Sequence, residues 1–139
     1  MNIRKLLKSD FNQYKQLIDS DIHLDMYNDF LDNVLSDLHF ILVVELDNNI
    51  IGTGTLFIEQ KLTYGGCKMG HIENILIDEM FRGKKYGEII VTHLLNLAKE
   101  NGCYRADLNC SSELEQFYKK NNFNQKYLCM NVYFNENFK

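Results

Sequence analysis

Hydrophobic residues change their spacing repeatedly along the 139-residue chain, and each change predicts a different element. Runs of alternating, β-branched and aromatic residues bounded by turn residues predict strands. Asp47-Asn-Asn49 is typical of a hairpin turn, and Gly52 and Gly54 inside the following strand indicate a bulge or close packing in preference to ligand contact. The predicted strands cover residues 1–6, 40–46, 50–59, 70–78, 103–110 and 124–134.

Apolar residues three and four positions apart predict four helices between these strands. The predicted helices cover residues 11–18, 26–38, 85–100 and 112–120. Residues suited to their ends are Ser9 and Asp10, Asp25, Asn101-Gly102, and the capping box Ser112-x-x-Glu115.

The predicted order of elements is β-α-α-β-β-β-α-β-α-β. Hairpins at the beginning give antiparallel strands, and strand-helix-strand crossovers at the end give parallel ones. We therefore expect an α/β fold of the α+β type, with one mixed sheet covered by helices on both faces. The length is typical of one domain, which we expect to span residues 1–139.

Charge limits the classes of partner. A formal net charge of −4 argues against a protein dedicated to nucleic acid or to anionic membranes. The charge is uneven, because residues 1–70 carry 6 basic and 10 acidic residues whereas residues 71–139 carry 9 of each. We therefore expect an anionic ligand to bind in the second half.

Four cysteines are spread through the chain without a C-x-x-C pair. With no signal peptide and no apolar run long enough to span a membrane, we expect a soluble, cytoplasmic protein. The histidines have no clustered partners, so no metal site is predicted. His71 is more typical of a structural histidine than of a substrate contact, and Cys110 is more typical of a buried packing residue than of a nucleophile.

A basic, glycine-bearing turn precedes the third predicted helix. The free N–H groups at a helix start, with Arg82, Lys84 and Lys85 beside them, form a candidate cradle for a diphosphate. A solvated basic loop is an equally good interpretation of this spacing alone. The turn matches neither a P-loop nor a dinucleotide-binding motif.

This turn, Arg82-Gly-Lys-Lys-Tyr-Gly87, resembles the acetyl-coenzyme A (acetyl-CoA) signature Q/R-x-x-G-x-G/A of the GNAT acyltransferase superfamily. The predicted order of elements is also similar to that fold. Three further segments look like stretches of the glucosamine 6-phosphate N-acetyltransferase family: Gly70-His-Ile-Glu-Asn-Ile, Asn101-Gly-Cys-Tyr-Arg and Gln116-Phe-Tyr-Lys-Lys-Asn-Asn-Phe123.

The resemblance implies direct attack of an amino sugar on the thioester of acetyl-CoA, in the pathway to UDP-N-acetylglucosamine. It implies that Tyr118, between Phe117 and Phe123, protonates the leaving thiolate, and that Glu73 orients the amine or takes its proton. Asn109 matches a position with catalytic and coenzyme contacts. The implied coenzyme-binding residues are Ile75, Leu76, Ile77, Arg82, Gly83, Lys84, Lys85, Tyr86, Gly87, Asn109 and Tyr118; the implied sugar-phosphate-binding residues are Lys61, Tyr64, Glu73, Asn74, Tyr104 and Arg105.

Several positions depart from the family pattern. Lys85 stands where the signature prefers glycine, and Asn74 and Asn109 replace acidic residues, which places more weight on Glu73. Leu114 and Tyr133 replace an asparagine and an arginine. These changes keep two alternatives open: an acetyltransferase for another small amine or amino sugar, and a non-catalytic sensor of coenzyme A. The resemblance also implies a homodimer, in which the predicted last strand crosses to the partner subunit.

Overall fold

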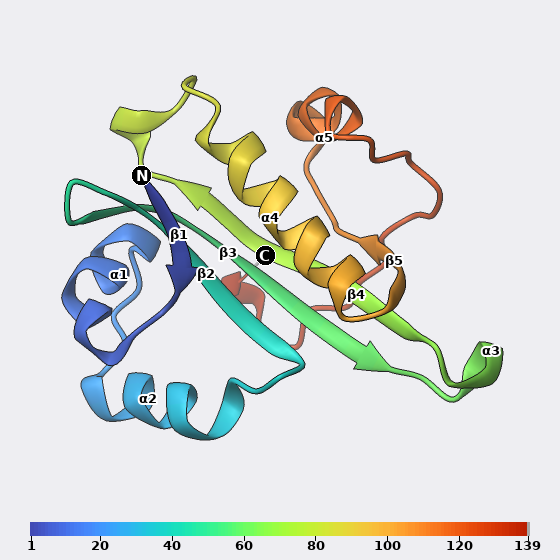
Figure 1. Ribbon diagram of the computed structural model, residues 1–139, viewed down its shortest axis with the longest axis horizontal. Coiled ribbons are helices and arrows are strands. Elements are labelled where there is room, and N and C mark those ends of the chain that lie inside the picture. Colours follow the sequence, from blue (N-terminus) through green and yellow to red (C-terminus); the bar gives the residue numbers. More distant parts are fainter. Residues whose placement is uncertain (139) are drawn as a thin grey trace. The chain divides into compact units, whose positions relative to one another are not determined.

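Five strands form one sheet in the order β1-β2-β3-β4-β5 in the computed structural model, which describes residues 1–138 (Figure 1). Strands β1 to β4 are antiparallel to their neighbours, and β5 runs parallel to β4. This confirms the mixed sheet that the sequence predicts. The strands are β1 (Asn2–Lys5), β2 (His39–Leu46), β3 (Asn49–Gln60), β4 (Lys68–Ile77) and β5 (Cys103–Asp107).

The chain divides into two compact units, Met1–Leu108 and Asn109–Lys139. The second unit contains α5 (Glu115–Lys120) and short 3-10 turns. The first unit contains the whole sheet and the helices α1 (Phe11–Ile18), α2 (Leu24–Asp29), α3 (Thr63–Gly66) and α4 (Tyr86–Glu100). A single domain over residues 1–139 stays a prediction.

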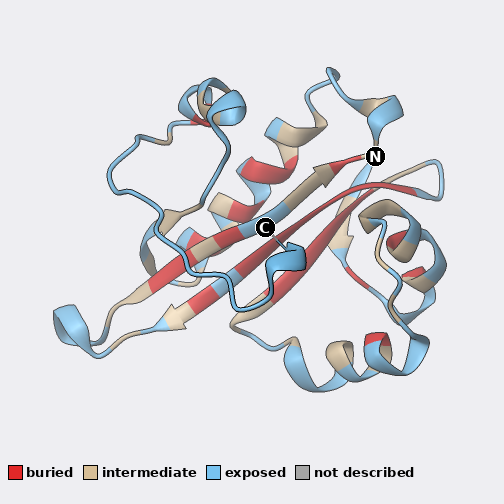
Figure 2. Ribbon diagram, turned by 180° about the vertical axis from the view of Figure 1, so that it is seen from behind, coloured by how far each residue is buried: buried red, intermediate tan, exposed pale blue. Residues whose placement is uncertain are grey.

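Helices of the first unit cover both faces of the sheet, as predicted. On one face α4 packs across β3 and β4 through its buried residues Ile90, Val91, Leu94 and Ala98 (Figure 1). On the other face α1 and α2 pack on a separate apolar cluster. Its buried members are Leu6, Tyr14, Tyr27, Ile41, Val43 and Ile50. Buried residues accordingly run along the central strands in Figure 2.

The glycines of β3 lie at closely packed positions, Gly54 against α4 and Gly52 against Ile77 of β4. A Cβ atom on Gly54 would lie 2.7 Å from Leu94 Cδ1, and one on Gly52 would lie 2.6 Å from Ile77 Cδ1. Neither space holds a side chain without movement of its neighbours. The close-packing interpretation of these glycines is therefore confirmed.

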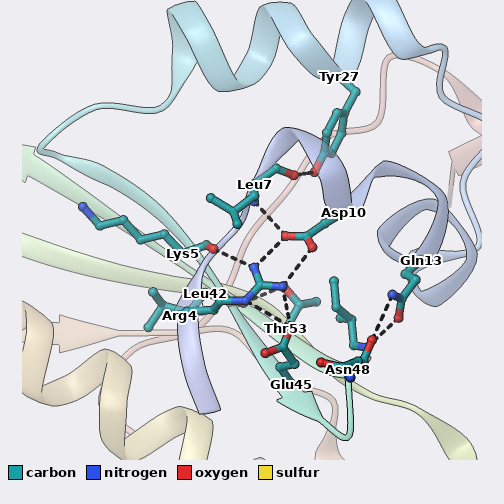
Figure 3. Close-up of polar contacts among 11 residues, drawn as sticks. Arg4, Lys5, Leu7, Asp10, Gln13, Tyr27, Leu42, Glu45, Asn48 and Thr53 are labelled. Atoms are coloured by element: carbon teal, nitrogen blue, oxygen red, sulfur yellow. Dashed lines mark hydrogen bonds and ion pairs between the residues drawn. The ribbon is translucent and has the colours of Figure 1, made fainter.

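The predicted left-handed cap at Asn101-Gly102 is confirmed, because Gly102 has a φ of 81° and its N–H donates to the Lys99 carbonyl at 3.0 Å after the end of α4. The predicted side-chain caps at the helix starts are wrong. Asp10 precedes α1 without capping it, because its carboxylate accepts hydrogen bonds from Arg4 and from the Leu7 N–H (Figure 3). The predicted helix over residues 26–38 is α2 followed by a π-helical turn, Phe30–Val34, and no side chain caps α2. The capping box at residues 112–115 is also absent, because Ser112–Leu114 is a 3-10 turn before α5.

The predicted last strand, residues 124–134, is wrong for a single copy of the chain. These residues form no strand, and their apolar side chains lie exposed. Alternation alone does not make a strand, because the backbone needs a neighbouring strand to bond with. Cys110, which was predicted to be buried, is exposed as well, because β5 ends at Asp107 before reaching it. The exposed apolar residues of the segment are Tyr127, Leu128, Met130, Val132, Tyr133 and Phe134.

Candidate active site

A β-bulge interrupts β4 directly after Glu73. Thr55 pairs with Glu73 and Thr53 pairs with Leu76, so between these pairs one residue of β3 opposes two of β4. Within the bulge Asn74 has a φ of 54°. Asparagine tolerates this left-handed conformation better than most residues do, because its short side chain bonds locally. The bulge therefore places Glu73, which is exposed, at the point where β4 changes direction.

Strand β5 leaves β4 near the same point. Their parallel pairing runs from Lys68 with Cys103 to His71 with Asp107, and β5 pairs with no residue beyond His71. One edge of β4 over residues 72–77 consequently has no strand neighbour in the described part of the chain. Ile75, Leu76 and Ile77, the predicted pantetheine contacts, lie along this edge.

The turn at residues 82–87 is shaped by two left-handed residues. Gly83 has a φ of 76°, and Lys85, which immediately precedes α4, has a φ of 70°. Arg82 Nε donates to the Ile77 carbonyl at 3.0 Å, which ties the turn to the end of β4. Lys84 Nζ lies 5.7 Å from the centroid of the Phe81 ring. The predicted bend before a long helix is confirmed, and its role in binding the coenzyme stays a prediction.

The first turn of α4 suits an anion. The Ile89 N–H reaches back to the Lys85 carbonyl at 3.1 Å, so the amides of Tyr86 and Gly87 precede the first intrahelical bond. A helix start also carries a partial positive charge. Together with Arg82, Lys84 and Lys85, these groups fit the diphosphate of a nucleotide coenzyme.

The predicted phosphate-binding residues gather near the start of β5 and the β3–β4 connection. The rings of Tyr64 and Tyr104 lie 6.0 Å apart, and the Arg105 guanidinium carbon lies 5.4 Å from the centroid of the Tyr104 ring. Tyr64 is exposed and left-handed, with a φ of 53°. Lys61 lies on the same connection, where its N–H donates to the Cys67 carbonyl at 2.8 Å.

His71 contacts two carboxylates. Its Nδ1 lies 2.9 Å from Asp107 Oδ1, and its Nε2 lies 2.9 Å from Glu59 Oε1. The hydrogen bond with His71 lowers the pKa of Glu59. The structural interpretation of His71 fits these contacts, but the sequence does not reveal the two partners.

In the second unit, Tyr118 lies in an aromatic cluster. Its ring centroid is 4.9 Å from that of Phe117 and 5.7 Å from that of Phe123, as the sequence predicts. The side chain is buried, and burial raises the pKa of the phenol, which therefore remains protonated at neutral pH. A protonated phenol can act as an acid. Asn109 lies in the same unit, and the catalytic roles of both residues stay predictions.

Residues 2–123 match the sequence model of the acetyltransferase (GNAT) family. The chain belongs to this family. GNAT acetyltransferases use acetyl-CoA, and the open edge of β4 beside the first turn of α4 fits that coenzyme. The fold class and the kind of enzyme predicted from the sequence are confirmed.

Within the GNAT family, the chain is similar to relatives that share one named activity. The chain is 41% identical over 104 residues to the probable glucosamine 6-phosphate N-acetyltransferase 2 of Oryza sativa subsp. japonica, a match that covers 72% of this chain and 63% of the relative. It is 35% identical over 127 residues to the glucosamine 6-phosphate N-acetyltransferase of Candida albicans, covering 84% and 85%.

A solved structure agrees with these relatives. The crystal structure of glucosamine-6-phosphate N-acetyltransferase from Arabidopsis thaliana matches with a TM-score of 0.91 at 32% identity. The match covers 96% of this chain and 98% of that chain. The GNAT fold of this chain therefore extends over nearly all of its length.

Other features of the described residues do not compete with this site. A shallow depression of about 330 Å³ lies on α1, and it contains none of the predicted site residues. Among residues 1–138 no group of three or more acidic, histidine or cysteine residues is placed to hold a metal ion. No helix in this part of the chain is both long and apolar enough to cross a membrane.

Proposed function

We propose that this GNAT protein transfers the acetyl group of acetyl-CoA to the 2-amino group of D-glucosamine 6-phosphate. The observation that carries the proposal is the similarity to relatives named for this activity in rice and Candida albicans. The rice match spans less than two thirds of that relative, whereas the Candida albicans match covers most of both chains. The gathering of Tyr64, Tyr104 and Arg105 adds aromatic and cationic groups suited to a sugar phosphate.

The coenzyme would be held by two parts of the first unit. Arg82, Lys84 and the amides at the start of α4 would bind the diphosphate, and backbone groups of residues 75–77 would pair with pantetheine along the open edge of β4. The coenzyme supplies a thioester as the acyl donor. A backbone N–H on this edge would stabilise negative charge on the thioester oxygen during attack.

Glu73 would act on the amine. A carboxylate at the bulge can orient the ammonium group and accept its proton, directly or through water. Asn74 and Asn109 carry amides, which cannot act as bases at neutral pH. Glu73 therefore carries the base function in the proposed set of residues.

Tyr118 would protonate the departing thiolate. Tyr118→Phe should lower kcat by about 100-fold and leave the affinity for acetyl-CoA unchanged, because the proton is needed only as the thiolate forms. Steady-state rates and calorimetric titration of acetyl-CoA measure the two effects separately. Tyr14→Phe, which also removes a buried phenol, is the matched control and should keep the wild-type kcat. An unchanged kcat in Tyr118→Phe would assign the proton to water.

A thiol-release assay tests the substrate. The purified protein should release coenzyme A from acetyl-CoA on addition of glucosamine 6-phosphate and not of glucosamine. Release only with unphosphorylated amines would favour the alternative of an acetyltransferase for another amine. Tight binding of acetyl-CoA without release for any amine would favour a coenzyme A sensor.

The exposed apolar residues of segment 124–134 support a homodimer in which this segment pairs with a second copy. Leu128, Met130, Val132 and Phe134 alternate in sequence and are exposed, as expected for a strand that completes its pairing on a partner. Light scattering should give twice the monomer mass. A monomer with full activity would exclude the exchange. We also propose a cytoplasmic location, where acetyl-CoA and reduced cysteines are available.

A further inference from the structure

His71 joins three strands of the first unit. Its ring nitrogens contact Asp107 at the end of β5 and Glu59 on β3, each at 2.9 Å, while His71 itself lies on β4. The Phe57 ring stacks on the imidazole with an interplanar angle of 25° and a centroid separation of 6.1 Å. The imidazole is therefore held in place by a carboxylate at each ring nitrogen and by the Phe57 ring against one face.

The contacts require the charged form of the ring. Ionised carboxylates only accept hydrogen bonds, and a neutral imidazole has a single N–H. Both contacts are hydrogen bonds only when both ring nitrogens carry a proton. Loss of one ring proton from His71 would leave a nitrogen lone pair facing a carboxylate oxygen and would break one of the two hydrogen bonds.

The contacts that join Glu59, His71 and Asp107 form a three-residue bridge, which lies where β4 and β5 separate. His71 and Asp107 form the last pair between β4 and β5, and the open edge of β4 begins at the next residue. Glu73 follows two positions later and therefore points to the same face of the sheet as His71. A shift of β4 against β5 at this pair would move Glu73 and the open edge together.

We propose that the Glu59–His71–Asp107 bridge is a positioning device, in which cationic His71 holds β4 and β5 together at the opening and thereby fixes Glu73 for acetyl transfer. The inference rests on the proposed function, because it assigns Glu73 to the amine. His71 is a positioning residue in this arrangement and does not itself touch the reacting atoms.

The charged and titratable groups around the ring come from four strands and from the β3–β4 connection. Asp107 and Glu59 contact it, Glu73 lies on its own strand, Lys61 lies beyond Glu59, and His39 on β2 packs against the far edge of Phe57. Loss of either ring proton removes one of the two hydrogen bonds, so activity that depends on the bridge should fall at alkaline pH.

Two substitutions of Asp107 distinguish the loss of the hydrogen bond to His71 from the loss of side-chain volume. Asp107→Ala removes one side of the bridge and should lower kcat on the order of tenfold, with the KM for acetyl-CoA unchanged. Asp107→Asn keeps the shape and adds an amide donor that can bond to a neutral ring, so it should retain most activity and lose less of it at alkaline pH.

Asp37→Ala, at an exposed carboxylate of the first unit, is the matched control and should behave as wild type. A wild-type kcat and pH profile in Asp107→Ala would overturn the proposal. So would equal losses of kcat in Asp107→Ala and Asp107→Asn at every pH, because the rescue depends on the donor geometry.

A measurement without substrate tests the bridge even if the proposed function fails. In ¹⁵N NMR of the intact protein, the bridge requires a proton on each ring nitrogen of His71, and Asp107→Ala should remove this signature at the same pH. A neutral His71 ring in the wild type would overturn the positioning role. Absence of thiol release by the wild type with every amine would overturn the proposed function, together with the assignment of Glu73.

Discussion

Two clusters in the first unit place one cation between two carboxylates, and they differ in nearly every other respect. Arg4 on β1 donates to Asp10 at 2.7 Å and to Glu45 on β2 at 2.9 Å (Figure 3). His71 on β4 contacts Glu59 and Asp107 at 2.9 Å. The Asp10 side chain is 6% exposed, whereas that of Asp107 is 47% exposed.

The difference shows how one arrangement can serve either the fold or the site. Arginine keeps its charge at any pH that proteins encounter, and Arg4 lies where β1 and β2 pair along their whole shared length. Histidine gains and loses its charge near neutral pH, and His71 lies at the last pair before two strands part. The charge of Arg4 in the first cluster does not depend on pH, and this cluster joins β1 to β2. The second cluster depends on the protonation of His71 and lies where β4 and β5 separate.

The largest expected contrast is in stability. Arg4→Gln should lower the free energy of unfolding by about 3 kcal/mol, because it leaves the buried Asp10 carboxylate without its cation. His71→Gln should change it by less than about 1 kcal/mol, because its partners are solvated. Urea unfolding of both variants measures the contrast. Equal losses would show that the two clusters are equivalent supports of the fold.

Acid titration is the second test. Burial alone would raise the pKa of Asp10, but hydrogen bonds from Arg4 and the Leu7 N–H, with the charge of Arg4, lower it overall. A lowered pKa in the folded state adds stability that is present above the ordinary value of 3.8 and is lost as the pH falls through the folded value.

Wild type should therefore lose more unfolding free energy than Asp10→Asn on acidification below pH 3.8. Thermal melts across this range measure the difference, with Asp37→Asn as an exposed control that should follow the wild type. If the stability of wild type and of Asp10→Asn fell in parallel with pH, Asp10 would not contribute to the loss of stability in acid.

Local sequence patterns predicted much of the secondary structure. The features that they missed depend on the register in which the strands pair. The turn at residues 82–87 and the helix after it are encoded by contiguous residues, so the sequence was sufficient to find them. The extra residue at Asn74 leaves no trace in the alternation of β4, because only pairing with β3 reveals it. Glu59, His71 and Asp107 are 12 and 36 positions apart, and strand register alone brings them together.

Two further failures, the cap at Asp10 and the strand over residues 124–134, have a similar cause. Asp10 was suited to cap α1 by its type, but Arg4 and the Leu7 N–H engage its carboxylate instead. Segment 124–134 has the alternation of a strand, yet a strand depends on what lies beside it. In both cases the residue types were favourable, and the outcome was decided by partners distant in the chain or outside the local pattern.

The smallest expected effect concerns backbone strain in the turn that precedes α4. Lys85 holds a left-handed conformation that glycine adopts without cost, so Lys85→Gly should raise the free energy of unfolding by about 1 kcal/mol. Lys85→Ala removes the same charge but keeps the Cβ atom, so it should give no such gain. Urea unfolding separates the two variants, and calorimetry should show weaker acetyl-CoA binding in both.

Greater stability with weaker binding would mean that Lys85 favours ligand binding at a cost in fold stability, whereas Arg4 supports the fold. Equal stability of Lys85→Gly and Lys85→Ala would contradict this, because backbone strain distinguishes the two variants and charge does not. Unweakened acetyl-CoA binding in both would instead show that the amides of α4 bind the diphosphate without help from this side chain.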